Sequence, residues 1–297
     1  MEAEKQKRIL TLAAIDIGSN AARMLIKRLE RTDNSIISKK LLFLRIPLRL
    51  GMDVFQEGRI GKDRGKMLTR TMKVFSELMA LYDIDDHLIY ATSAFRDAKN
   101  SNSIIRQIKK STKLDICVIS GEEEARIIHD SFHAEGNLLH VDVGGGSTEL
   151  SLVCNGTLKD SCSVNIGTIR LLKKTITSED WKEFFFQIRR LMHGVDNLRI
   201  VGSGGNINKL ARLAGNDGEK QQLKVEKLKS LYTQMASIPL KQRMVEYDLS
   251  ESRADVIVPA AQIFIIVAHL TKASDILVPN VGLADGMISR MAHTVWD

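Results

Sequence analysis

The chain has 297 residues, of which 44% are hydrophobic and 27% are charged, values typical of a soluble globular protein with about two domains. Three scattered cysteines argue against a disulfide framework or a cysteine zinc site and favour a reducing compartment. The net charge is +7, and the excess falls in residues 1–120, with 23 basic and 14 acidic residues (+9) against 20 and 22 (−2) in the remainder.

This uneven charge suits an anionic partner, because a basic surface raises the local concentration of anions. Nucleic acid is disfavoured as that partner, since aromatic residues make up only 5% of the chain and no basic run is interleaved with stacking side chains. The first eight residues are charged and lack the apolar core of a signal peptide. The longest apolar stretch, residues 256–270, contains Pro259, Gln262 and His269, so it predicts a buried helix rather than a membrane span. We therefore expect a cytoplasmic protein with no membrane partner.

Apolar periodicity predicts strands alternating with helices in the first part of the chain. The expected strands are residues 12–17, 22–29, 36–45, 87–92 and 114–119. The expected helices are residues 62–82 and 101–110, the first of which has apolar residues at helical spacing. This alternation indicates α/β layers in which helices cover a sheet.

The same alternation continues after Ser120, where we expect a hinge between a first lobe at residues 1–120 and a second at 121–297. The expected strands are residues 138–143, 149–154, 199–201 and 275–278. The expected helices are residues 122–133, 166–174, 178–192, 205–214 and 284–292, in a final third that is mainly helical.

One motif occurs twice. Residues 15–20 read IDIGSN, and residues 141–149 read VDVGGGSTE. Each is a β-branched run that ends on an aspartate, Asp16 or Asp142, and then turns on glycines and hydroxyl residues. Glycine allows a ligand to approach the backbone, and successive N–H groups in such a bend attract anions. The repeat predicts two halves that face each other across an anionic, metal-bridged ligand.

A third glycine turn, VGSGGN at residues 201–206, again lies between a strand and a helix. A helix N-terminus preceded by glycines suits a phosphate or the sugar edge of a nucleotide. The turn lacks the spacing of a dinucleotide fingerprint, and the chain contains no P-loop motif.

Residues 120–126, SGEEEAR, begin a helix that connects the two loops. Ser120 and Glu123 have the spacing of a capping box, and Glu122 is an acid that the helix dipole favours in a first turn. Glu124 is not needed by the box. It is either another dipole-favoured surface acid or a general base that points into the cleft.

Four stretches together resemble the exopolyphosphatase / guanosine pentaphosphate phosphohydrolase (Ppx/GppA) family. They are IDIGSN at 15–20 with Arg23, ATSAFRDAKN at 91–100, SGEEEAR at 120–126 and DVGGGSTE at 142–149. The resemblance extends to about residue 292 and is to the short form, without extra C-terminal helical domains. It implies an α/β fold of two actin-like (ribonuclease H-like) lobes facing a central cleft.

The resemblance also implies Mg²⁺-dependent hydrolysis of a terminal phosphoanhydride, in polyphosphate or guanosine pentaphosphate. Glu124 would be the general base, while Asp142, Glu149 and Asp16 would hold the metal through hard oxygen ligands. Arg23 and Arg96 would neutralise phosphoryl oxygens. The backbone around the glycine loops would bind phosphates, at Gly18, Ser19, Asn20, Gly144, Gly145, Gly146, Ser147 and Gly204.

Three positions depart from the family pattern: Ala21 in place of serine, Asn206 in place of threonine, and Ala284 in place of an arginine that reaches phosphate. These departures leave the expected base and metal ligands intact but keep the substrate open. They also keep open a non-catalytic polyphosphate or alarmone regulator, while the glycine loops alone fit an ATP-dependent kinase or ATPase. The sequence leaves the oligomeric state open, a homodimer included.

Overall fold

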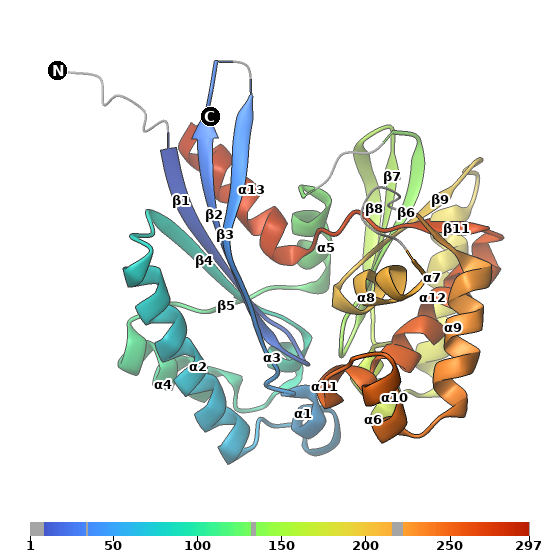
Figure 1. Cartoon of the computed structure of the whole chain (residues 1–297), viewed down its shortest axis with the longest axis horizontal. Helices are drawn as coiled ribbons and strands as arrows, with labels where there is room; N and C mark the ends of the chain where they lie inside the picture. Colours follow the sequence, from blue (N-terminus) through green and yellow to red (C-terminus); the bar gives the residue numbers. More distant parts are fainter. Residues whose placement is uncertain (1–8, 34, 132–134, 216–221, 297) are drawn as a thin grey trace.

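The computed structural model describes residues 9–33, 35–131, 135–215 and 222–296. Two sheets lie side by side, each covered by helices (Figure 1). We call the part built on the first, five-stranded sheet the first lobe, and the part built on the second, six-stranded sheet the second lobe.

The first sheet has the strand order β3-β2-β1-β4-β5. Strands β1, β2 and β3 form an antiparallel meander, and β4 and β5 continue the sheet in parallel with β1. Strand β1 is an almost continuous buried apolar run, as expected of a strand covered on both faces. The strands are β1 (Ile9–Ile17), β2 (Ala22–Arg31), β3 (Ile36–Ile46), β4 (Asp86–Ala91) and β5 (Cys117–Val118).

The second sheet has the order β10-β11-β9-β6-β7-β8. Its antiparallel meander is β6-β7-β8, and β9 and β11 follow in parallel, so five of its strands repeat the order and directions of the first sheet. The strands are β6 (Asn137–Val143), β7 (Thr148–Cys154), β8 (Thr157–Val164), β9 (Arg199–Ser203), β10 (Gln222–Lys224) and β11 (Asp275–Leu277). The prediction of an α/β protein built of two lobes is confirmed.

Helices cover both sheets. In the first lobe they are α1 (Gly51–Glu57), α2 (Lys62–Leu81), α3 (Ser93–Asp97) and α4 (Ser101–Thr112). After α5 (Gly121–His129) they are α6 (Thr168–Lys173), α7 (Ser178–Met192), α8 (Gly205–Leu213), α9 (Val225–Ser237), α10 (Leu240–Glu246), α11 (Glu251–Ala254), α12 (Ile257–Thr271) and α13 (Leu283–Trp296).

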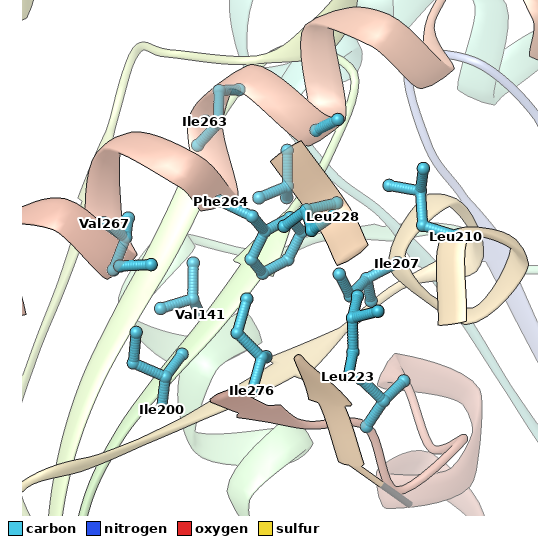
Figure 2. Packing of buried hydrophobic residues seen from close by; sticks show 14 of the residues in the cluster. Val141, Ile200, Ile207, Leu210, Leu223, Leu228, Ile263, Phe264, Val267 and Ile276 are labelled. Carbon is cyan, nitrogen blue, oxygen red and sulfur yellow. The ribbon is translucent and has the colours of Figure 1, made fainter. Parts of the chain in front are cut away.

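Helix α12 packs at the centre of the second lobe. Residues Glu251–Thr271 are long and apolar enough to span a membrane by length and composition alone, with a mean hydropathy of 1.8. Ile263, Phe264 and Val267 of this helix are instead fully buried, and they pack over Ile200 and Ile276 of the sheet (Figure 2). The helix therefore forms the core of the lobe, as its sequence predicted.

The last helix, α13, crosses back to the first lobe and lies beside β1 and β2 (Figure 1). Its residues Leu283, Met287 and Met291 share one apolar cluster with Leu12 and Leu25 of the sheet. Asp285 at its start receives Lys27 Nζ at 2.8 Å. The division at residue 120 stays a prediction, but the cover of the first sheet includes this C-terminal segment.

Several elements differ from their predictions. The sequence did not indicate β8, a polar strand at the edge of its sheet, nor the short elements α1, α3 and β10. Strand β5 keeps only two residues of the expected six. Helix α5 ends at His129, and the rest of the helix expected to residue 133 falls partly on residues 132–134, outside the described residues.

Candidate functional site

The two glycine loops face each other where the lobes meet. Each is closed by the same turn, because the Gly18 N–H donates to the Ala21 carbonyl and the Gly144 N–H donates to the Ser147 carbonyl, both at 3.0 Å. A Cβ added to Gly145 would lie 2.9 Å from Ser19 Cβ in the opposite loop. Glycine is required there because the lobes approach too closely for a side chain.

A cavity of about 150 Å³ lies between the loops. Most of the residues that the sequence singled out line it: Asp16, Gly18, Ser19, Asn20, Arg23, Glu124, Asp142, Gly144, Gly145, Gly146, Ser147, Glu149 and Gly204. These residues come from the ends of β1 and β6 and the loops that follow them, from β2 and β7, from α5 and from the turn before α8. The fold therefore brings segments that are far apart in the sequence to one site.

Arg96 lies just behind this cavity and connects the lobes. One guanidinium nitrogen of Arg96 donates to the Ile119 carbonyl at 3.0 Å and to Glu124 Oε2 at 3.1 Å. The other donates to Ser147 Oγ at 3.2 Å and lies 3.7 Å from Glu149 Oε1. In this structure Arg96 thus orders the acids and the second loop.

Glu124 is buried at the start of α5 and is only 9% exposed. Burial and the nearby Glu149 carboxylate raise the pKa of Glu124 well above its ordinary value, although Arg96 opposes the shift. A carboxylate with a raised pKa in a cavity has the character of a general base. The sequence alone left open whether Glu124 is a surface acid or a general base, and its burial in the cavity wall favours the base.

The neighbours of Glu124 have structural roles. Ser120 caps α5, since its Oγ accepts the Glu123 N–H at 3.1 Å. The Glu123 side chain does not complete the expected capping box and pairs instead with Arg290 of α13. Arg290 also donates to Asp130 at 2.9 Å. The helix that carries Glu124 is therefore anchored to α13 at both ends.

The acids of the second lobe, Asp142 and Glu149, lie opposite each other in the β6–β7 ladder, and Arg96 lies 3.7 Å from Glu149. Desolvation raises the pKa of Asp142 to about 6. Burial, with Asp142 nearby, raises the pKa of Glu149 to about 7. Glu149 Oε1 accepts hydrogen bonds from Ser147 Oγ at 2.6 Å and from Ser163 Oγ at 2.9 Å, which fixes its orientation.

The acid of the first lobe has a different environment. Asp16 is 3% exposed and pairs with Arg23, whose guanidinium lies 2.5 Å from Asp16 Oδ2. The two residues face each other across the β1–β2 ladder. Asp16 and Arg23 line the site as the sequence predicted, but they lie there as an ion pair.

The third loop passes next to Asp142. Gly204 has a φ of 100°, and a Cβ at this position would lie 2.8 Å from Asp142 Oδ1. Glycine therefore provides both the left-handed backbone and the close approach to the carboxylate. Helix α8 begins directly after it, so its free N–H groups lie at the edge of the cavity.

Sequence reasoning missed several residues of the site. The chain segment 280–285 before and within α13 lines the cavity, as do Thr92, Ser93, Asn208 and Phe43. Arg170 supports the second loop, because its Nε donates to the Gly146 carbonyl at 2.7 Å while the guanidinium lies 4.2 Å from the centre of the Phe55 ring. The sequence gave a signal for Thr92 and Ser93, which lie in the 91–100 stretch, and for Ala284, which departs from the family pattern.

Residues are present that suit a divalent cation. No group of three His, Cys, Asp or Glu side chains among the described residues is arranged as a metal cage. Mg²⁺ commonly binds through one or two carboxylates together with water and substrate phosphates, so it needs no such cage. Asp142 and Glu149, which both line the cavity, provide these oxygen donors, and the donor set therefore fits Mg²⁺.

Comparisons with known proteins identify a family for this chain. Residues 36–295 match the Ppx/GppA phosphatase family. A bifunctional 3-dehydroquinate synthase/phosphatase of Fusobacterium nucleatum is 32% identical over 180 residues, which cover 58% of this chain and 27% of that protein. Exopolyphosphatase 1 of Mycobacterium bovis is 25% identical over 175 residues, which cover 57% of this chain and 50% of that protein. The match thus spans between a quarter and half of these two relatives.

Solved structures match over nearly the whole chain. A Ppx/GppA family member from Aquifex aeolicus is 26% identical, with a TM-score of 0.77 over 97% of this chain and 99% of that chain. An exopolyphosphatase from Cytophaga hutchinsonii is 21% identical, with a TM-score of 0.81 over 96% and 98% of the two chains, and shows the same fold.

Proposed function

The chain belongs to the Ppx/GppA phosphatase family, and from this premise we propose that it is a Mg²⁺-dependent phosphohydrolase. It releases the terminal phosphate of inorganic polyphosphate, guanosine pentaphosphate or both. The observation that carries the proposal is the position of Glu124: a buried carboxylate of raised pKa on the wall of a cavity lined by two glycine loops.

Glu124 acts as the general base. Its raised pKa makes it a better proton acceptor than an ordinary surface glutamate, and its carboxylate is exposed to the cavity where a water molecule can lie. Arg96 keeps the carboxylate in place through the 3.1 Å contact. Glu124 takes the proton of that water as the water attacks the terminal phosphorus.

The loops and arginines bind the phosphates. Phosphoryl transfer depends mainly on positioning and electrostatic stabilisation, and backbone N–H groups of the two facing loops provide both. Arg23 lines the cavity, and a planar guanidinium matches the geometry of phosphate oxygens. These groups hold the substrate chain in line with the water that Glu124 deprotonates.

Asp142 and Glu149 would hold Mg²⁺, with Asp16 approaching from the other lobe. When bound, the cation supplies neutralisation of the phosphate oxygens and of the developing charge. Without it, several carboxylates and a polyanion would share one small cavity. We also expect a cytoplasmic location and no nucleic acid or membrane partner.

A panel of phosphate-release assays tests the proposal. Short polyphosphate, long polyphosphate, guanosine pentaphosphate and ATP with an acceptor are each incubated with the protein, with and without Mg²⁺. Phosphate release that requires Mg²⁺ and is lost in Glu124→Gln is the expected result. Tight binding of these anions with no release under any metal would instead identify a sensor, and transfer from ATP to an acceptor would identify a kinase.

A further inference from the structure

Phe43 is the only aromatic side chain among the described residues that line the cavity. It lies on the edge strand β3 and is 51% exposed. The other lining residues are mainly glycines, hydroxyl residues, carboxylates and cations. A large apolar ring is therefore kept in water at the mouth of a site that is built for anions.

The register of the first sheet places Phe43 relative to the site. Arg23 pairs with both Asp16 and Arg45 across the ladder, and Leu25 pairs with Phe43 two residues further along. Phe43 and Arg45 thus share one face of β3, the face that carries Arg23. Two strand spacings and two residues along the strand place Phe43 about 12 Å from Asp16, measured between Cα atoms.

The segment 280–283 lines the same cavity mouth as Phe43. This segment is fastened to the first sheet, because Asp285, which caps it by accepting the Gly282 N–H at 3.1 Å, also pairs with Lys27 of β2. Lys27 is two residues from Leu25, the partner of Phe43 in the ladder. The exposed ring thus has a fixed backbone segment near it at the entrance.

An aromatic ring does not favour the binding of a polyphosphate chain. The face of a phenylalanine ring carries partial negative charge, so it repels phosphate oxygens. A nucleobase has the opposite properties: it is flat and largely neutral, and it stacks well on aromatic side chains and on arginine planes. Arg45 lies beside Phe43 on the same strand face and adds a second plane of this kind.

We propose that Phe43, with Arg45 beside it, forms the stacking platform for the purine base of a nucleoside polyphosphate whose phosphates enter the glycine loops. This assignment rests on the proposed function, since it takes the cavity as the phosphate site. It makes Phe43 a determinant of nucleotide over polyphosphate, and the distance from Asp16 leaves room for a ribose and a short phosphate chain.

The second lobe offers the competing place for a base. Asn208 of α8 also lines the cavity, and its Oδ1 is buried without a hydrogen-bond partner. A base held there would depend on the Asn208 amide and would leave Phe43 without a role. The two locations therefore make opposite predictions for single variants.

The experiment compares kcat/KM for guanosine pentaphosphate and for short linear polyphosphate in Phe43→Ala, Phe43→Tyr and Asn208→Ala. We expect Phe43→Ala to lower kcat/KM for guanosine pentaphosphate on the order of tenfold while polyphosphate hydrolysis is unchanged. Phe43→Tyr should restore the nucleotide reaction. Phe186→Ala, which removes a phenylalanine that is 58% exposed on α7, is the matched control and should alter neither reaction.

An equal effect of Phe43→Ala on both substrates, no effect on either, or a nucleotide-specific loss in Asn208→Ala alone would overturn the assignment. If the wild-type protein releases phosphate from neither substrate, the proposed function fails and calorimetric binding of guanosine pentaphosphate decides the inference. Weaker binding in Phe43→Ala, again on the order of tenfold, then supports the platform, and an unchanged Kd overturns it.

Discussion

The two lobes place an aspartate at equivalent positions, Asp16 at the end of β1 and Asp142 at the end of β6. Both strands are central in sheets of the same order, and both lead into a glycine loop closed by the same 3.0 Å turn. The surroundings of the two carboxylates differ, however. Asp16 is paired with Arg23, whereas Asp142 has the nearby acid Glu149 and a pKa raised to about 6.

This difference indicates a division of labour between the lobes. The first lobe supplies two cations: Arg23 of β2 lines the cavity, and Arg96 of α3 contacts Glu124 from behind it. The second lobe supplies acids whose charge the protein leaves partly uncompensated. The same strand and loop therefore have two roles: in the first lobe they lie beside cations that suit a polyanion, and in the second lobe they lie beside acids that suit a metal cation.

The largest expected effect is that of Glu124→Gln, which tests whether Glu124 is the general base. Glu124→Gln keeps the size of the side chain but cannot accept a proton, and a positioned base typically contributes about 10²–10⁴-fold. We expect kcat to fall by that factor with little change in substrate Kd, as measured by steady-state kinetics and calorimetry.

Glu122→Gln is the matched control, because Glu122 is exposed on the same turn and contributes only about 0.3–1 kcal/mol through the helix dipole. Glu123→Gln should act on stability rather than on proton transfer, since it weakens the pair with Arg290. Full activity in Glu124→Gln would show that Glu124 is not the general base.

The second prediction compares the two aspartates directly. Asp142→Asn should raise the Mg²⁺ concentration needed for half-maximal activity by about 10–100-fold or more, since even changes beyond the ligands cost that much. Asp16→Asn should raise it less, because Asp16 is already neutralised by Arg23. Titration of activity with Mg²⁺ measures both, and an equal loss in the two variants would show that the lobes contribute equally to the metal.

The third prediction concerns Arg96, the cation of the first lobe that contacts Glu124. Arg96 lowers the pKa of Glu124 against the effect of burial, so Arg96→Gln should raise that pKa further. The acid limb of the kcat/KM profile should then move to higher pH by about one unit or more. Arg106→Gln, at an exposed arginine of α4, is the control. If the acid limb of the kcat/KM profile does not move, the pKa of Glu124 does not determine that limb.

The smallest expected effect is on stability in the absence of metal. Because the folded state raises the pKa of Asp142 to about 6 and of Glu149 to about 7, it holds protons that the unfolded chain has lost. The contribution of these groups to stability is therefore present at low pH and is lost as pH rises through about 6 and 7. We expect the Tm of the metal-free protein, relative to that of Asp142→Asn, to fall across this window.

Adding Mg²⁺ should restore this Tm above pH 7 and have little effect below pH 6, where protons compete for the same carboxylates. Differential scanning fluorimetry at several pH values measures the change. Equal stabilisation by Mg²⁺ at all pH values would count against Asp142 and Glu149 as the cation site.

Part of the molecule was predictable from local pattern. Helix α7 has the bounds that its periodicity predicted, and the central strands β1 and β6 were recognised from buried β-branched runs. Strand β8 was not, because an edge strand such as TLKDSCSV is stabilised by pairing with β7 and not by its own apolar residues. Only one half of the capping box predicted at Ser120 forms. The Ser120 hydroxyl caps the helix, but the Glu123 carboxylate pairs with Arg290, which is 167 residues away.

The sequence by itself determined the α/β alternation, the repeated strand and glycine loop, and the residues that these loops contribute to the site, because each depends on neighbours along the chain. Tertiary structure decided that α13 returns to the first sheet and that Asp16 is paired while Asp142 is not. It also decided that Glu124 is buried, and that Phe43 lies at the mouth of the cavity. Burial and charge at these positions depend on segments that are distant in sequence, and no local pattern records them.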